Sequence, residues 1–272
     1  MKNVLITGCS TGIGAATAEL FAKKGWNVFA GSRHPEELHF NQKGITPMRI
    51  DVNDNESIAL CFRHLEEQKV QLDVIINNAG YGLLLPFEDT PKEKIEELFR
   101  ANVFGLMEVC RHAATIMREQ GSGTIINISS VIGQVGAPFY TVYAASKFAV
   151  EGFSESLYHE MRPFGVHVKI VEPGATKTEY HRVAYDIGNM KVSEPYRKIY
   201  EHKRATHDQH AADYTPASVV ADVIYAAATD GTWKLRYPVG AATKATIRWR
   251  HFLPEQYFLK KLYERFIGGW GR

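Results

Sequence analysis

Tyr143 and Lys147 stand four residues apart, so on a helix their side chains share one face. An ammonium held near a phenol stabilises the phenolate and lowers the pKa of the phenol from about 10 towards neutrality. Such a phenol can exchange a proton with an alcohol or carbonyl oxygen near neutral pH. Tyr257 and Lys261 have the same spacing, so spacing alone does not identify the reactive pair.

The surroundings separate the two pairs. Ser130 precedes Tyr143 by thirteen residues and follows the strand-like run 124–128. The carboxyl ends of parallel strands are where α/β proteins bind ligands, and a serine hydroxyl there can hold a substrate oxygen. Tyr257 belongs instead to an amphipathic pattern near the end of the chain. We therefore expect Ser130, Tyr143 and Lys147 to form the reactive group.

A glycine-rich turn follows the first apolar run, residues 4–6, and precedes a helical pattern over 12–24. Glycines let the backbone approach a pyrophosphate closely, and a helix N-terminus offers free N–H groups and a partial positive charge. At the first strand-to-helix turn of an alternating chain, this favours a dinucleotide site over a bare tight turn. The expected contacts come from Gly8, Ser10, Thr11, Gly12, Ile13 and Gly14.

The residues that follow the second apolar run, 28–30, indicate which dinucleotide binds. An NAD site places an acid there to hold the ribose 2′-hydroxyl, and the following segment has no acid before Glu36. Arg33 offers instead a planar guanidinium suited to a 2′-phosphate. A solvated surface arginine is the plainer alternative, and the glycine turn holds no second cation. We expect NADP(H), with NAD(H) as the alternative.

Short apolar runs alternate with helical patterns along the chain. This order predicts a parallel sheet with helices on both faces: a single three-layer α/β domain over 1–272, of the doubly wound Rossmann type, with about seven strands. Asp54, Thr90-Pro91 and Thr215-Pro216 mark helix starts, with the prolines expected in the first turn. The runs are 4–6, 28–30, 48–50, 74–76, 124–128, 166–171 and 235–239, and the helical patterns are 12–24, 54–69, 91–118, 140–161 and 215–229.

The composition is that of an ordinary globular protein, with 272 residues, 45% hydrophobic and 23% charged. The formal net charge of +2 gives no indication of a nucleic-acid partner, and we expect none. The three cysteines, Cys9, Cys61 and Cys110, are far apart and odd in number, which favours a reduced, intracellular protein. No secretory leader or long apolar span is apparent, so we expect a cytoplasmic location.

Together, these motifs resemble the short-chain dehydrogenase/reductase family over about residues 1–230. The stretches 8–14 and 146–152 are most similar to its hydroxysteroid and retinol dehydrogenase branch. The resemblance implies hydride transfer between NADP(H) and a carbonyl/alcohol pair on a fairly apolar substrate. We also expect a homodimer or homotetramer. In the family's order and spacing, the chain has the glycine turn, Asn77-Asn78-Ala79-Gly80, Ser130, Tyr143 with Lys147, and Pro173-Gly174.

The resemblance implies a catalytic role for four residues. Tyr143 would give a proton to the nascent alkoxide during reduction, and Ser130 would hydrogen-bond the substrate oxygen. Lys147 would lower the pKa of the phenol and hold the nicotinamide ribose. Asn102 matches the family's helix asparagine that anchors a proton-relay water, and a satisfied polar residue inside helix 91–118 is the alternative.

The resemblance also implies further cofactor contacts. Asp51 and Val52, after the third strand, would frame the adenine. The segment after the sixth strand would pass under the nicotinamide carboxamide, with Thr178 supplying a hydroxyl. The remaining residues implied are Asn78, Ala79 and Gly80 after the fourth strand, and Pro173, Gly174 and Thr176 after the sixth.

Two regions break the alternation: residues 176–214, polar and weakly periodic, and residues 243–272, aromatic and basic. Both follow late strands, where open α/β sheets build their substrate sites. We expect 176–214 to form substrate loops without a metal site, because its histidines lack a ligand spacing with supporting partners. The histidines are His202, His207 and His210, with Asp208 beside them. We expect apolar pocket walls from Leu83, Leu84, Leu85, Phe139, Tyr185, Met190 and the aromatic tail.

The tail, residues 243–272, carries seven Lys and Arg against two Glu. It could pack over the substrate entrance, contact another subunit, or lie on an anionic membrane surface. We favour packing in the core or against a subunit, the usual fate of an apolar stripe. After Pro254, expected in a first turn, one helical face gathers Phe258, Leu259, Leu262, Tyr263, Phe266 and Ile267.

Two other functions remain open at this point. Epimerases and dehydratases of nucleotide sugars share the Tyr–Lys pair, but their last two glycines are usually three residues apart, whereas Gly12 and Gly14 are two apart. An inactive dinucleotide-sensing module needs no proton donor, so the intact set of Ser130, Tyr143 and Lys147 favours an enzyme.

Overall fold

The computed structural model describes residues 1–178, 190–210 and 213–267. A sheet of seven parallel strands lies at its centre, in the order β3-β2-β1-β4-β5-β6-β9. The chain runs from β1 through β2 to β3 at one edge and then crosses back to β4 beside β1, which is the doubly wound arrangement that the sequence predicts. The strands are β1 (Asn3–Thr7), β2 (Asn27–Ser32), β3 (Ile45–Arg49), β4 (Val74–Asn77), β5 (Gly123–Ile128), β6 (Val166–Glu172) and β9 (Arg236–Pro238).

The central strands are apolar at nearly every position because both faces of the sheet are covered. In β1, Val4, Leu5 and Ile6 have no exposed surface, and Val74 and Ile75 of the neighbouring β4 are at most 1% exposed. Val4 is in register with Val74 on one side of β1. Continuous β-branched runs therefore identify the strands, whereas an alternating pattern would have indicated a half-exposed sheet.

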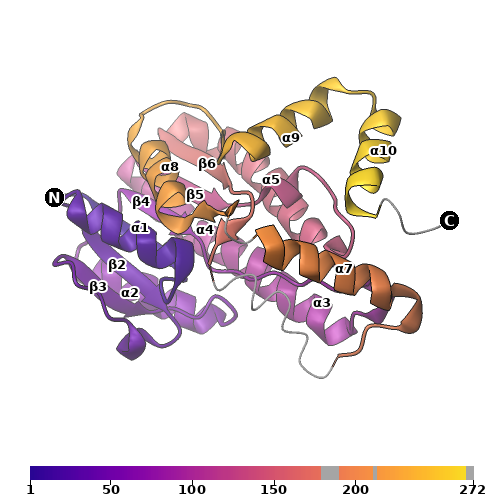
Figure 1. Cartoon of the computed structure of the whole chain (residues 1–272). Helices are drawn as coiled ribbons and strands as arrows, with labels where there is room; N and C mark the ends of the chain where they lie inside the picture. The colour runs from indigo at the N-terminus through magenta and orange to yellow at the C-terminus, as the bar shows by residue number, and fades with distance from the viewer. Residues whose placement is uncertain (179–189, 211–212, 268–272) are drawn as a thin grey trace.

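Helices cover both faces of the sheet, which gives three layers (Figure 1). On one face, α1 (Gly12–Lys23) and α8 (Ala217–Thr229) pack together against one half of the core. On the other face, α2 (Asn55–Glu67), α4 (Gly105–Gln120) and α5 (Thr141–Met161) enclose the second half. Short 3₁₀ turns are η1 (Pro35–Glu37), η2 (Phe87–Asp89), η4 (Val131–Gly133) and η5 (Arg162–Phe164).

The single helix predicted over 91–118 is wrong in one respect. The structure has α3 (Lys92–Phe99), a π-helical segment η3 (Arg100–Phe104), and then α4. Asn102 lies in this widened segment, and its side chain bonds both backbone groups of Tyr81. A π segment inserted in an α-helix is frequent at functional sites, and no periodicity in the sequence reveals it.

Helix starts are predicted well at Asp54 and less well at the prolines. The Asp54 side chain accepts a hydrogen bond from the backbone N–H of Glu56 at 3.0 Å, as an N-cap does. Pro91, Pro216 and Pro254 occupy the cap position just before α3, α8 and α10 (Glu255–Phe266), not the first turn. Their ψ angles, between 133° and 145°, are extended and place them outside the helices.

The region 176–214 is more regular than predicted. Strands β7 (Thr176–Lys177) and β8 (Thr215–Pro216) form a separate two-stranded sheet, and helix α7 spans Glu194–His210. The inner face of α7 is formed by Tyr196, Ile199, Tyr200 and Lys203. Because tyrosine and lysine dominate this face, apolar periodicity is weak. Tyr185 and the side chains of His207, Asp208 and His210 lie outside the described residues.

Two helices follow β9, α9 (Ala241–Phe252) and α10, and Figure 1 shows α10 at an angle to α9 and away from the sheet. Of the predicted apolar stripe, Phe258 is buried, whereas Leu259 and Tyr263 are about half exposed. Phe258 therefore packs within the chain, and for Leu259 and Tyr263 packing against another subunit stays a prediction. In the described part of the chain, no helix is long and apolar enough to cross a membrane.

Candidate active site

The glycine turn joins β1 to α1 at the carboxyl edge of the sheet. Gly8 has a φ of +72°, in the left-handed region that favours glycine, and a Cβ there would lie 2.8 Å from the Cα of Ala79. A Cβ on Gly14 would lie 2.1 Å from the carbonyl oxygen of Gly8. The turn thus forms a cradle of bare backbone before the N-terminus of α1, which fits a pyrophosphate. The rest of the turn is Ser10, Thr11, Gly12 and Ile13.

Thr7 and Asn78 hold this turn against β4. The Thr7 hydroxyl accepts hydrogen bonds from the backbone N–H groups of Asn78 at 3.1 Å and Ala79 at 3.0 Å. The side-chain amide of Asn78 donates to the carbonyl oxygens of Thr7 at 3.0 Å and Gly8 at 2.9 Å. Asn78 therefore fixes the shape of the cradle, a function that motif spacing alone does not reveal.

Arg33 follows β2 at the same edge of the sheet. The hydroxyl oxygens of Ser10 and Ser32 lie 3.0 Å apart, which ties the end of β2 to the glycine turn. The Arg33 side chain is exposed, and within residues 1–178, 190–210 and 213–267 nothing bonds to its guanidinium. Its donors are therefore available at the rim of the cradle.

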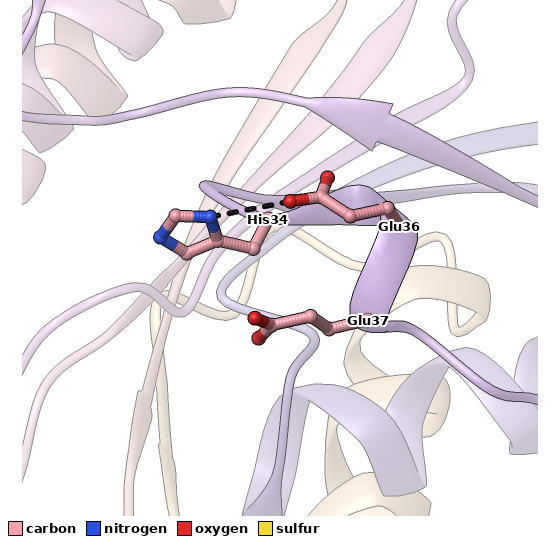
Figure 2. A group of neighbouring side chains, drawn as sticks. All are labelled: His34, Glu36 and Glu37. Atoms are coloured by element: carbon pink, nitrogen blue, oxygen red, sulfur yellow. Dashed lines mark hydrogen bonds and ion pairs between the residues drawn. The ribbon is translucent and has the colours of Figure 1, made fainter.

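A small acidic group follows Arg33. Figure 2 shows Glu36 and Glu37 on η1 and His34 just before it, with the His34 ring facing the Glu36 carboxylate. The His34 Nδ1 lies 3.3 Å from a carboxylate oxygen of Glu36. The backbone N–H of Glu36, and then the His34 ring, lower the pKa of that carboxyl. Side-chain donor atoms of the three residues lie within 4.8 Å of one another. All three are exposed, and such groups are common without a metal, so their main effect is negative charge beside Arg33.

Ser130, Tyr143 and Lys147 lie at the carboxyl end of β5. The Lys147 ammonium lies 5.9 Å from the centre of the Tyr143 ring. It donates a hydrogen bond at 2.8 Å to the carbonyl of Ile128, the last residue of β5. The Ser130 hydroxyl caps η4 by accepting from the backbone N–H of Ile132 at 3.2 Å. The three side chains are 5–8% exposed, so any charge among them acts with little solvent screening.

Burial controls the protonation of Lys147. It lowers the pKa of the ammonium to about 8, and the carboxylate of Glu151, one turn further along α5, acts in the opposite direction. At pH 7 the ammonium is therefore still mostly charged. A buried cation beside a phenol is the arrangement that makes the phenol a better proton donor.

A buried carboxyl pair, Glu151 and Glu172, lies behind the site lysine. Gln134 donates to both carboxylates at 3.0 Å, and the Arg236 guanidinium donates to Glu151 at 3.0 Å and to the more exposed Glu155. Burial raises the pKa of both carboxyl groups, and the Glu151 charge raises that of Glu172 further. The sequence reasoning missed this cluster. Its one signal is that Glu151 continues the four-residue spacing of the site tyrosine and lysine.

Asn102 is placed by the π segment against the loop after β4. Its side-chain oxygen accepts from the N–H of Tyr81 at 3.0 Å, and its amide donates to the Tyr81 carbonyl at 2.9 Å and to the Ser146 hydroxyl at 3.2 Å. A Cβ on Gly80 would lie 2.8 Å from the same oxygen. Asn102 thus joins the cofactor side of β4 to the residue before the site lysine.

The loop after β6 lies across the glycine turn. The methyl carbon of Thr178 is 3.1 Å from the position that a Cβ on Gly12 would take. The Thr176 hydroxyl donates to the Gly174 carbonyl at 3.0 Å, and the Pro173 carbonyl accepts from the first N–H of η4 at 2.9 Å. The loop therefore spans from the site serine to the cradle, as a segment beneath a dinucleotide must.

Asp51 and Val52 follow β3 and turn towards α4. The Asp51 carboxylate accepts hydrogen bonds from the backbone and side-chain N–H groups of Asn53, at 2.9 and 3.2 Å. The Val52 carbonyl oxygen lies 2.2 Å from where a Cβ on Gly105 would be. The Asp51 carboxylate is thus partly occupied by its own turn.

Two apolar clusters lie against Tyr143 and Tyr140. The ring centres of these tyrosines are 6.1 Å apart, and Tyr140 packs against both clusters. The apolar side of the site is therefore continuous from the α5 start to helix α7. The predicted wall residues found there are Leu83, Leu85 and Met190 in the first cluster, and Leu84 and Phe139 in the second.

With this geometry in place, comparison with known proteins is decisive. Residues 2–186 match the profile of the short chain dehydrogenase family. The chain belongs to this family. It is 34% identical to the uncharacterized oxidoreductase YusZ of Bacillus subtilis, over 96% of this chain and 99% of that protein. This short-chain dehydrogenase is therefore an oxidoreductase that acts on an alcohol/carbonyl pair, which confirms the family that the motifs indicate.

Solved structures share its fold, among them two described as short-chain dehydrogenases. One from Streptomyces avermitilis superposes with a TM-score of 0.81 at 29% identity, over 97% of this chain and 96% of that one. ElxO with NADP bound has a TM-score of 0.74 and 25% identity, over 90% and 99%. A Burkholderia phymatum enzyme in complex with NAD has a TM-score of 0.80 and 25% identity, over 95% of both chains. Structures of this type thus bind either dinucleotide.

Proposed function

We propose that the protein transfers hydride between NADP(H) and a secondary or primary alcohol and its carbonyl, on a fairly apolar substrate. The observation that carries this is the buried group of Ser130, Tyr143 and Lys147 at the end of β5, next to a backbone cradle at the end of β1. The apolar clusters around Tyr143 support a substrate with an apolar body. The substrate is then a ketone, an aldehyde, or a steroid- or retinol-like compound.

The residues present fit a dinucleotide, because glycine at positions 8 and 14 lets the turn close against Ala79 and the Gly8 carbonyl and leaves bare backbone before α1. Gly8, Gly12 and Gly14 would receive the pyrophosphate at the N-terminus of α1. Arg33 would hold the 2′-phosphate, which favours NADP(H), while the carboxylates of Glu36 and Glu37 oppose a second negative charge there. When bound, the nicotinamide supplies or accepts the hydride. The other proposed contacts are Ser10, Thr11, Ile13, Asp51, Val52, Asn78, Ala79, Gly80, Pro173, Gly174, Thr176 and Thr178.

Each residue of the reactive group has a proposed task. Tyr143 gives its proton to the substrate oxygen as that oxygen gains negative charge, and takes it back in the oxidative direction. Ser130 donates a hydrogen bond to the same oxygen. Contacts of the Ser130 hydroxyl with the Pro173 carbonyl and the Ile132 N–H keep it in place. Lys147 stabilises the phenolate and hydrogen-bonds the nicotinamide ribose. Its buried charge is worth several times what an exposed one would be.

For Asn102, the bonds to Tyr81 and Ser146 favour a positioning role over a relay water held by its side chain. Its amide hydrogens are both used by these partners, and one lone pair of its oxygen remains. Asn102 would hold the Gly80–Tyr81 segment against α5 at Ser146, the residue before Lys147.

The test is a panel of carbonyls and alcohols assayed by cofactor absorbance, with NADPH and NADH side by side. We expect reduction of apolar ketones or aldehydes with a higher kcat/KM for NADPH. Turnover of no carbonyl or alcohol with either cofactor would contradict the proposal, and a preference for NADH would contradict the role of Arg33.

We also propose a homo-oligomer and a location in the cytoplasm. The half-exposed side chains of α9 and α10 fit a subunit contact in a homodimer or homotetramer. The three cysteines are free and buried, which fits the reducing cytoplasm. Sedimentation at several concentrations tests the first, and flotation with anionic liposomes at low and high salt tests the membrane alternative.

A further inference from the structure

Lys203 is a buried lysine on the inner face of α7, outside the catalytic group. Its side chain is 91% buried, leaving 9% exposed. The ammonium lies 4.9 Å from the centre of the Tyr140 ring and 4.4 Å from that of Phe266 in α10. Two aromatic rings, one at the start of α5 and one at the end of α10, therefore contact the charge.

Among residues 1–178, 190–210 and 213–267, no oxygen atom pairs with this ammonium, unlike those of the buried Lys147 and Lys169. Lys147 donates to the Ile128 carbonyl, and Lys169 donates to a carbonyl and pairs with Asp230. For Lys203, the described part of the chain supplies no hydrogen-bond acceptor and no carboxylate. Burial alone lowers the pKa of Lys203 to about 8, with no acid acting against it. Rings stabilise a cation but leave its three N–H donors unused.

A buried donor without an acceptor costs free energy. A ligand that brings an acceptor to the Lys203 ammonium would remove this cost. The residues around Lys203 indicate the chemical class of this ligand. The Tyr140 ring centre lies 6.1 Å from that of Tyr143, so the Lys203 ammonium is within about 11 Å of the reactive phenol ring. Tyr200, one turn before it, packs on Phe139 in the apolar wall. Lys203 thus lies at the far end of the same apolar surface that faces Tyr143.

We propose that Lys203 binds a carboxylate at the end of the substrate remote from the carbonyl. The substrate class is then an oxo acid or hydroxy acid: an apolar body with the reacting carbon at Tyr143 and the anionic end between Tyr140 and Phe266. A charge-assisted bond in this low-dielectric position selects for the anion, and the rings exclude water around it. This inference rests on the proposed function.

The test compares acids with their own neutral esters. Oxo carboxylates with a terminal aldehyde and six to twelve carbons are each assayed with NADPH beside the methyl ester of the same compound. At pH 7 we expect at least one chain length at which the acid exceeds its ester in kcat/KM by about tenfold or more. In Lys203→Met, that ratio of acid to ester should fall by about tenfold or more, mostly through the KM of the acid.

Control measurements distinguish a ligand-binding role of Lys203 from a structural one. Lys198→Met changes an exposed lysine of the same helix and should leave the acid-to-ester ratio as it is. Lys203→Met should bind NADPH normally, and its melting temperature should be unchanged or higher, because it removes an unpaired buried charge. A lower melting temperature would show that Lys203 is a structural residue and would overturn the proposal.

Different results would refute the carboxylate site and the dehydrogenase activity. If the enzyme reduces acid and ester equally, or if Lys203→Met keeps the ratio, the carboxylate site is refuted while the dehydrogenase activity stands. If neither the acids, nor the esters, nor any other carbonyl is reduced, the proposed function itself is refuted.

Discussion

Replacing Glu151 by glutamine removes the carboxylate that lies one helical turn from Lys147 along α5. Two unit charges about 6 Å apart interact by about 3 kcal/mol at an effective dielectric constant of about 20. That equals about 2 pKa units, and Arg236, 3.0 Å from Glu151, offsets part of it. We therefore expect the pKa of Lys147, about 8 in the native protein, to fall to about 7 in Glu151→Gln.

The sign of the effect on activity follows from the charge that Lys147 must carry. Reduction is lost as pH rises through the pKa of Lys147, because the ammonium that stabilises the phenolate is then neutral. In Glu151→Gln the loss begins about one pH unit lower, so kcat/KM falls about fivefold at pH 8 and little at pH 6. The assay is the pH profile of carbonyl reduction at constant ionic strength.

Glu155→Gln is the matched control, because Glu155 bonds the same Arg236 from a more exposed position a further turn away. It should move the alkaline limb by less than about 0.3 pH unit, since exposed charges are screened. An alkaline limb that stays in place in Glu151→Gln, or moves to higher pH, would refute the electrostatic coupling along α5.

Three other substitutions test the cofactor site and its support. Arg33→Ala should raise the KM for NADPH about tenfold to a hundredfold and leave that for NADH nearly unchanged, and equal losses with both cofactors would refute the 2′-phosphate contact. Gly14→Ala places a Cβ 2.1 Å from the Gly8 carbonyl oxygen, so cofactor binding followed by fluorescence should be lost; normal binding would contradict the cradle. Asn102→Ala removes three hydrogen bonds and should lower the free energy of unfolding in urea by about 2–4 kcal/mol, whereas a loss below about 1 kcal/mol would show that the Tyr81 segment does not depend on it.

The centre of the sheet is predictable from the sequence because its strands are compact apolar runs, whereas the edge strands β3 and β9 include polar and partly exposed residues. Residues such as Val4 and Ile75 need no partner information to be recognised as buried on both faces. The family is equally predictable, because its motifs lie at strand ends in a specific order. The π segment at Asn102 is not, since widening a helix by one residue leaves no periodic trace at this length.

Contacts between distant segments explain most of what the sequence reasoning missed. The cluster of Glu151, Glu172 and Arg236 joins α5, β6 and β9, and only the folded sheet brings these three together. Helix α7 escaped prediction because its buried face carries Tyr200 and Lys203 where a core helix usually has aliphatic residues. The exposed part of the α10 stripe cannot be distinguished from a buried one by spacing alone.

The phenol of Tyr143 is the proposed proton donor, and the Tyr143→Phe variant tests that role most directly. The variant keeps the ring that packs in the apolar cluster and removes only the hydroxyl. We expect NADPH to bind with unchanged affinity by fluorescence titration, while the single-turnover rate of carbonyl reduction falls by about a hundredfold to ten-thousandfold. A single-turnover rate within about threefold of the native protein, at full cofactor occupancy, would contradict the central role assigned to this residue.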